Sequence, residues 1–300
     1  MERDIFIISV YCLVADIMQI IEKSHKFRTR GFPPKLTDSE VITMEICGEF
    51  FKLHEDTEIY KHFKRHYSHF FPNLPERTNF VRQAANLWQV KLFVQMMMTG
   101  LSEQNLDPVQ SIDTLPLPVC TYTRGGFRDR RFPDVARFGH CAAKKLDYYG
   151  FKLGLRIARS RMITHFPLLS ARRHDIFHLG SLIEGFSGTV PADKGFLDAY
   201  QEQLWNEIQN TQIITPTRKN MEISSEQVKL VKKTKYWRKL IETVGSQLTE
   251  RFQITKIKVK DLWHYQNRIF RKILSHTVGV FINIQNGNKP LQLALLDEVI

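Results

Sequence analysis

Three acidic residues, Asp113, Asp193 and Glu242, are candidates for metal-dependent chemistry on a phosphodiester. Carboxylate oxygens are the hard ligands that Mg²⁺ and Mn²⁺ prefer, and no cluster of histidines or cysteines in the sequence competes for this role. Two such ions, about 3.5 to 4 Å apart, can stabilise charge on both the attacking and the leaving oxygen. Carboxylates that the fold brings together could therefore hold divalent metal for reactions such as phosphodiester cleavage.

Basic residues gather around these acids. Residues 1–111 hold 13 Lys and Arg against 14 Asp and Glu, whereas residues 112–175 hold 13 against 5 and residues 214–275 hold 15 against 5. The stretch between the two basic blocks holds 1 against 5. Two basic blocks around an acidic one suit a polyanion lying beside a carboxylate site, and nucleic acid is the obvious candidate. A solvated basic surface without a partner is the alternative.

The basic residues nearest to the acids in sequence are candidate DNA contacts, since lysine and arginine neutralise phosphates. One group follows the first acid and the other precedes the third, and the alternative is again a solvated surface. The candidates are Arg124, Arg128, Lys235, Arg238 and Lys239.

A long helix over residues 236–252 is predicted to carry Glu242. At 100° per residue, Ile241, Val244 and Leu248 fall on one apolar stripe, and Glu242 falls on a basic and hydroxylic face beside it. An ordinary helical ion pair between Glu242 and Arg238, four residues earlier, would explain the glutamate without catalysis.

The first hundred residues are predicted to be helical. The apolar stretch 5–21 is too short and too polar to span a membrane, so we expect a buried helix. Thr37 and Glu40 have capping-box spacing, and further helices are expected near 58–67 and over 78–98.

The periodicity changes after residue 107. Strands are expected over 109–113, 151–157 with one buried face, 162–169 and 212–215, and a helix over 196–210. Pro116 and Pro118 are expected to stop the first strand. The order is a strand with Asp113, a hairpin, a strand ending at Asp193 and a helix with Glu242; for Asp175, a helix N-cap and a catalytic role both remain open.

This order resembles the ribonuclease-H-like core of the DDE transposases, with separations of 193 − 113 = 80 and 242 − 193 = 49 residues. Within that group, five segments resemble the transposases of the bacterial insertion-sequence family numbered nine-eight-two. The segments are Leu36–Thr43, Arg82–Trp88, Ile112–Cys120, Ile241–Val244 and Asp261–His264, the last in a basic helix through Arg268, Arg271 and Lys272.

The resemblance implies a fold and an activity. The fold is mixed α/β, with a helical domain over 1–105 for recognition of DNA ends and a ribonuclease-H-like catalytic domain over 106–300 that includes the basic C-terminal helix. The activity is cleavage at transposon ends and joining of the freed 3′-hydroxyl to target DNA. Asp113 would bridge two Mg²⁺ or Mn²⁺ ions, and Asp193 and Glu242 would each complete one coordination shell.

The expected partners are double-stranded DNA, as terminal inverted repeats and target, and further copies of the chain in a homodimer or larger synaptic complex. The four scattered cysteines contain no CxxC pair, which favours a reducing compartment, so we expect a cytoplasmic, nucleoid-associated protein without a membrane partner. Two alternatives remain: a nuclease that cuts without joining, and a catalytically inactive, transposon-derived DNA-binding protein.

Overall fold

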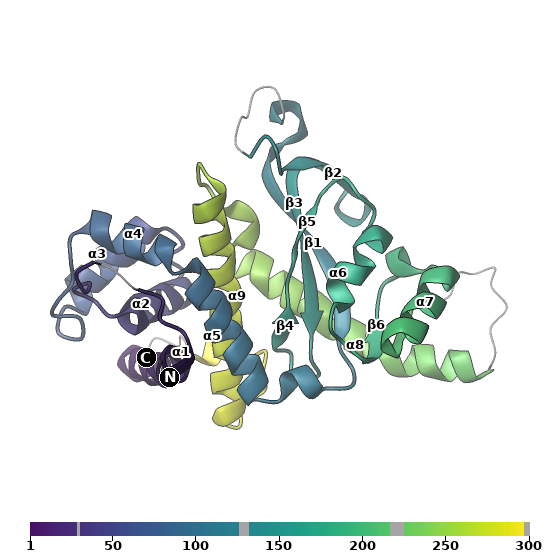
Figure 1. The fold of residues 1–300 in the computed structure, drawn as a ribbon, viewed down its shortest axis with the longest axis horizontal. Coiled ribbons are helices and arrows are strands. Elements are labelled where there is room, and N and C mark those ends of the chain that lie inside the picture. The colour runs from purple at the N-terminus through teal and green to yellow at the C-terminus, as the bar shows by residue number, and fades with distance from the viewer. Residues whose placement is uncertain (29–30, 126–131, 217–224, 297–300) are drawn as a thin grey trace. The chain divides into compact units, whose positions relative to one another are not determined.

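The computed structural model describes residues 1–28, 31–125, 132–216 and 225–296 (Figure 1). The chain forms two compact units. The helical unit consists of Met1–Ser102 together with Leu248–Ile300, and the sheet unit consists of Glu103–Gln247. The C-terminal segment thus groups with the N-terminal helices, whereas the sequence had suggested one catalytic domain over 106–300.

The helical unit is an all-helical assembly. α2 begins at the predicted capping box, in which Thr37 accepts from the Glu40 amide and the Glu40 carboxylate accepts from the Thr37 amide. α9 packs against α5 and α2. The helices are α1 (Arg3–Ser24), α2 (Asp38–Phe50), α3 (Asp56–His66), α4 (Arg77–Asn86), α5 (Trp88–Leu101) and α9 (Leu262–Gln285).

α1 contains the apolar stretch that was predicted to be a buried helix. By length and composition alone, α1 could also cross a membrane. Core helices of soluble proteins meet the same two criteria. One face of α1 is buried, through Phe6, Val10 and Val14, and the Phe6 ring lies 4.7 Å from that of Phe50 in α2. Packing inside the helical unit thus accounts for the apolar residues on that face.

The single helix predicted over 78–98 is instead two helices, α4 and α5. A break in a helix frees carbonyl groups that need other donors. The Ala84 carbonyl accepts from the buried ammonium of Lys91 at 3.0 Å, and the Ala85 carbonyl accepts from the Trp263 indole at 2.6 Å. One side chain from the next helix and one from the distant α9 thus stabilise a break at which the sequence has neither Gly nor Pro.

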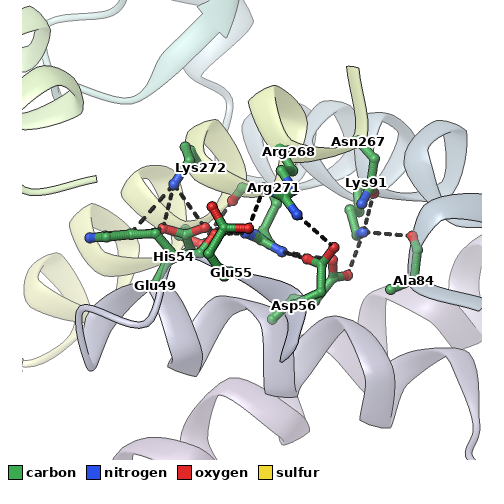
Figure 2. A network of polar contacts seen from close by, with 12 residues as sticks. Glu49, His54, Glu55, Asp56, Ala84, Lys91, Asn267, Arg268, Arg271 and Lys272 are labelled. Carbon is green, nitrogen blue, oxygen red and sulfur yellow. Dashed lines mark hydrogen bonds and ion pairs between the residues drawn. The ribbon is translucent and has the colours of Figure 1, made fainter. Parts of the chain in front are cut away.

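The basic residues of α9 point into the helical unit and form a buried ion-pair network (Figure 2). Arg271 is fully buried, and its guanidinium bonds to Glu49 at 2.6 Å and to Asp56 at 2.5 Å. Lys272 bonds to Glu49 at 2.8 Å. α9 therefore belongs to the helical unit because α2 and α3 supply the acids that neutralise it. The other members of the network are Glu45, His54, Glu55, Lys91, Asn267 and Arg268.

The sheet unit is built on the long strand β3. β1 pairs antiparallel with β3 along its whole length, and β2, β5 and β4 pair antiparallel with successive parts of β3. β6 and β7 are parallel to each other, and a parallel bridge between Val109 and Thr189 connects β6 to the start of β1. The strands are β1 (Ser111–Thr121), β2 (Arg137–Cys141), β3 (Leu146–Ile157), β4 (Ile163–His165), β5 (Leu168–Ser170), β6 (Gly188–Pro191) and β7 (Thr211–Ile214).

Three strand predictions differ from the structure. β1 continues through Pro116 and Pro118. These prolines are two residues apart, so their nitrogens lie on the same edge of the strand. An unpaired edge needs no N–H donor there, and no hydrogen bond of the sheet is lost. β3 is buried from Tyr148 to Ile157, not on one face only, because it is flanked on both edges and covered by α6 (Leu179–Ile183). The returning strand, predicted over 162–169, is interrupted between β4 and β5.

Two longer helices complete the sheet unit. α7 (Ala199–Gln209) begins after Asp198, whose carboxylate accepts from the amides of Tyr200 and Gln201. α8 (Ser225–Glu250) is longer than predicted. Ile241 and Val244 of its apolar stripe are buried, as predicted, while Glu242 is exposed.

Candidate active site

Asp113 and Asp193 occupy equivalent positions on neighbouring parallel segments. Val109 pairs with Thr189 in the bridge between the start of β1 and β6, and Asp113 and Asp193 each lie four residues further along. The bridge brings the segments that lead to Asp113 and Asp193 side by side, because neighbouring strands lie about 4.8 Å apart. Asp113 lies within β1, and Asp193 lies two residues after the end of β6.

Glu242 is connected to this region by Arg238. The guanidinium of Arg238 donates to the Asp193 carboxylate at 2.6 Å. Because Arg238 and Glu242 are one helical turn apart, Glu242 lies about 6 Å further along α8 than the residue that contacts Asp193. The helical ion pair proposed as the alternative for Glu242 is therefore not the contact that Arg238 makes.

Asp113 experiences the negative charge of its neighbours. Burial raises its pKa, and the charges of Asp193, Asp175 and Glu242 raise it further, to about 7, although the Thr114 amide donates to its carboxylate at 2.7 Å and opposes the shift. The three predicted acids are thus close enough to interact electrostatically. Asp193 and Glu242 are exposed to solvent, whereas Asp113 is half-buried.

Asp175 is a fourth carboxylate at the site. One of its oxygens accepts both from the Thr114 hydroxyl at 2.9 Å and from the Lys152 ammonium at 2.7 Å. Thr114 follows Asp113 in β1, and the other oxygen of Asp175 faces Gly195, two residues after Asp193. Asp175 does not cap a helix through its side chain, so its N-cap interpretation was wrong.

The position of Lys152 in the sequence could have indicated its ion pair with Asp175. It lies in an apolar strand pattern, and a lysine in a fully buried strand needs an anionic partner. Lys152 is only 8% exposed, and its ammonium also donates to the Arg173 carbonyl at 2.9 Å. The choice of Asp175 as the partner depends on the pairing of β3 with β5, which positions residue 175 beside β3.

The predicted DNA contacts fall in different places. Arg238 lies at the carboxylates, and Lys235 and Lys239 are exposed on the same helix. Arg124 is exposed beyond the far end of β1, and the eight residues from Asp113 to the end of that strand span roughly 26 Å. Arg128 lies outside the described residues.

The site's donor set fits divalent cations in its chemistry. Four carboxylates with one associated arginine and one associated lysine leave net negative charge, and oxygen ligands suit Mg²⁺ or Mn²⁺. As the side chains stand, no group of three potential ligands among the described residues is arranged around a single ion position. The ion pair between Arg238 and Asp193 occupies one of the candidate ligands.

Comparison with known families assigns the chain. A model of the transposase DDE domain matches residues 103–261, more than half of the 300 residues. The chain belongs to the DDE transposase domain family. The match begins where the sheet unit begins and includes Asp113, Asp193 and Glu242. No curated protein and no solved structure matches the chain. Membership in the DDE family implies a transposase-type enzyme that acts on DNA.

Proposed function

We propose that this chain is a DNA transposase that cleaves phosphodiester bonds at transposon ends and joins the 3′-hydroxyl to target DNA. Asp113, Asp193 and Glu242 are its catalytic residues and the ligands of two divalent ions, Mg²⁺ or Mn²⁺. The observation that carries the proposal is the parallel bridge four residues before both Asp113 and Asp193, together with the ion pair between Asp193 and Arg238, one turn from Glu242.

The side chains divide the work. Asp113, Asp193 and Glu242 bind the cations, which when bound stabilise charge on the attacking and leaving oxygens. Arg238 holds Asp193 in the absence of metal and is available to a DNA phosphate when Asp193 binds a cation. Lys152 and Thr114 hold Asp175, a positioning residue, beside the strand that carries Asp113.

We also propose a ribonuclease-H-like core within the sheet unit, of the kind found in the insertion-sequence family numbered nine-eight-two. Strand order supports this: β7, β6, the start of β1, β3 and β2 follow one another, with β6 and β7 parallel to the start of β1 and β3 antiparallel to it. This order supports the proposal because it brings the first and fourth strands of such a core side by side, which would let two acids 80 residues apart lie close together.

The helical unit is proposed to recognise the terminal inverted repeats, and the protein is proposed to act in the bacterial cytoplasm as a homodimer or larger synaptic complex on double-stranded DNA. Arg124, Lys235 and Lys239 are proposed as further DNA contacts, because each is an exposed cation in the sheet unit.

The test is a strand-joining assay. The purified full chain, with Mg²⁺ or Mn²⁺, is given duplex DNA carrying the element's terminal repeats, either intact or already cut, together with a supercoiled target plasmid. We expect cutting of intact ends and joining of cut ends. Asp113→Asn, Asp193→Asn and Glu242→Gln should each abolish both reactions without weakening DNA binding, whereas Glu207→Gln, an exposed carboxylate on α7, should leave both intact.

The alternatives predict other products. Cutting without joining of pre-cut ends identifies a nuclease. Binding of the terminal repeats without either reaction identifies a catalytically inactive DNA-binding protein. Full activity of Asp113→Asn contradicts the assignment of the metal site.

A further inference from the structure

The helical unit contains a surface cavity that the carboxylate site does not use. Its volume is about 470 Å³, within the range of small-ligand pockets. It lies where α4 meets the first turn of α9. Residues from both Arg82–Trp88 and Asp261–His264, two segments singled out in the sequence, line it. The residues that matter are Arg77, Val81, Arg82, Asn86, Trp263 and His264.

Trp263 provides a fixed aromatic surface in this cavity. Its indole nitrogen donates to the Ala85 carbonyl at 2.6 Å, a carbonyl near the break between α4 and α5. The residue nevertheless remains 50% exposed. A large aromatic ring that is anchored at one edge and open to solvent is suited to stacking, because its orientation is set before a ligand binds.

The polar groups around the ring are those that a nucleotide requires. Arg77 and Arg82 are exposed, and neither forms an ion pair among the described residues, although Arg82 bonds to the Asn79 side chain at 3.0 Å. Asn86 offers an amide for base edges. No acidic residue lines the cavity, although Asp261, adjacent in sequence, pairs with His264 at 2.8 Å. An anionic ligand with a flat ring therefore fits best.

We propose that this cavity binds an unpaired nucleobase of DNA, stacked on Trp263, with the flanking phosphates on Arg77 and Arg82. The inference rests on the proposed function for its choice of DNA over other nucleotides. Stacking on an aromatic side chain accepts any base, so the cavity holds a distorted or single-stranded part of the DNA and does not read its sequence.

The test measures binding of the full chain, in metal-free buffer, to three fluorescein-labelled oligonucleotides: a single strand of 12 nucleotides, a blunt duplex, and the duplex with a short unpaired tail. Trp263→Leu should weaken binding of the single strand and the tailed duplex roughly five- to 150-fold, the effect of losing one stacked base. Trp263→Phe should retain part of the affinity, because it retains a ring. Binding of the blunt duplex should change little.

Two substitutions at exposed arginines test the cavity without disturbing the fold. Arg77→Gln and Arg82→Gln should each lower the slope of log affinity against log salt by roughly 0.7 on the single strand. Arg65→Gln, an exposed arginine on α3 outside the cavity, removes the same charge and should change neither the stacking effect nor the tailed-duplex preference.

Tryptophan fluorescence gives an independent readout. Single-stranded DNA should quench emission in the wild type and markedly less in Trp263→Phe. Equal affinities of wild type, Trp263→Leu and the arginine variants for tailed DNA overturn the proposal. The function is judged separately by the joining assay with Asp113→Asn. If wild type cuts and joins DNA and Asp113→Asn does not, while the cavity variants bind normally, only the cavity proposal fails.

Discussion

Arg238 donates to Asp193 across 2.6 Å, so α8 is connected to the end of β6 by an ion pair between a proposed DNA contact and a proposed metal ligand. The side chain of Asp193 remains 59% exposed, which leaves it accessible to a competing cation. If Asp193 binds a metal ion as proposed, the pair would couple metal binding to the release of a guanidinium. Four predictions follow from this and related contacts.

The first prediction concerns metal affinity. Arg238→Gln should raise the affinity for Mn²⁺ roughly 1.4- to fivefold, because an exposed ion pair that competes with the metal is worth about 0.2 to 1 kcal/mol. The same change should weaken DNA binding. Isothermal titration calorimetry measures the Mn²⁺ affinity, and fluorescence anisotropy measures the DNA affinity. Lys239→Gln is the matched control, and it should weaken DNA binding without raising metal affinity; a lower Mn²⁺ affinity in Arg238→Gln would contradict the proposed competition.

The second prediction concerns pH. The pKa of Asp113 is raised from 3.8 to about 7, so the folded protein retains a proton there that the unfolded chain loses at lower pH. Stability from this group is therefore present below about pH 4 and is lost as pH rises towards 7, by at most about 4 kcal/mol. Asp113→Asn should melt at a higher temperature than wild type at pH 8 in EDTA and at the same temperature at pH 3. An unchanged difference across this range would contradict the assigned environment.

The third prediction concerns Asp175. Asp175→Asn should keep the bond from Thr114 but lose the ion pair with the buried Lys152, at a cost of about 1 to 3 kcal/mol in the free energy of unfolding. The variant should cut DNA at least tenfold more slowly and should bind DNA with unchanged affinity. Measuring its Mn²⁺ affinity shows whether the slower cutting comes from weaker metal binding or from lower stability. Asp134→Asn, an exposed aspartate in the same unit, should change none of these. Wild-type cutting by Asp175→Asn would remove this residue from the site.

The fourth prediction concerns the buried network. Lys91→Met should cost about 3 to 5 kcal/mol in the free energy of unfolding, because it leaves the buried carboxylate of Glu45 without its nearest ammonium. Adding Glu45→Gln should recover part of this loss, since the double variant no longer buries that charge. Denaturant unfolding of Lys91→Met, Glu45→Gln and the double variant measures the coupling. Equal losses in the single and double variants would indicate that the pair contributes nothing.

The positions of the three acids on a strand, after a strand and on a helix could be predicted because they depend on local patterns. Apolar runs and helical periodicity assign Asp113, Asp193 and Glu242 to their elements without information about the rest of the chain. Their catalytic role remains a prediction. The resemblance, and not the periodicity, suggested that they meet.

Contacts between distant residues could not be predicted in this way. Asp175 and Thr114 are 61 residues apart, and Arg271 and Glu49 are 222 apart. Their pairing depends on which elements pack together, and a charged residue in a helix gives no local sign of burial. The basic appearance of α9 was therefore misleading as to its position, because its cations are neutralised within the protein and are not displayed to DNA.

The helical unit is made from two stretches of chain, with the whole sheet unit encoded between them. During synthesis the ribosome therefore releases the sheet unit before α9, which carries Arg271 and Lys272, can reach the carboxylates of α2 and α3. Until then, Glu49 lacks Arg271 and Lys272, and Glu45 has Lys91 but lacks Arg271. The helical unit can therefore complete its fold only after the sheet unit has been translated, a delay inherent in non-local folding.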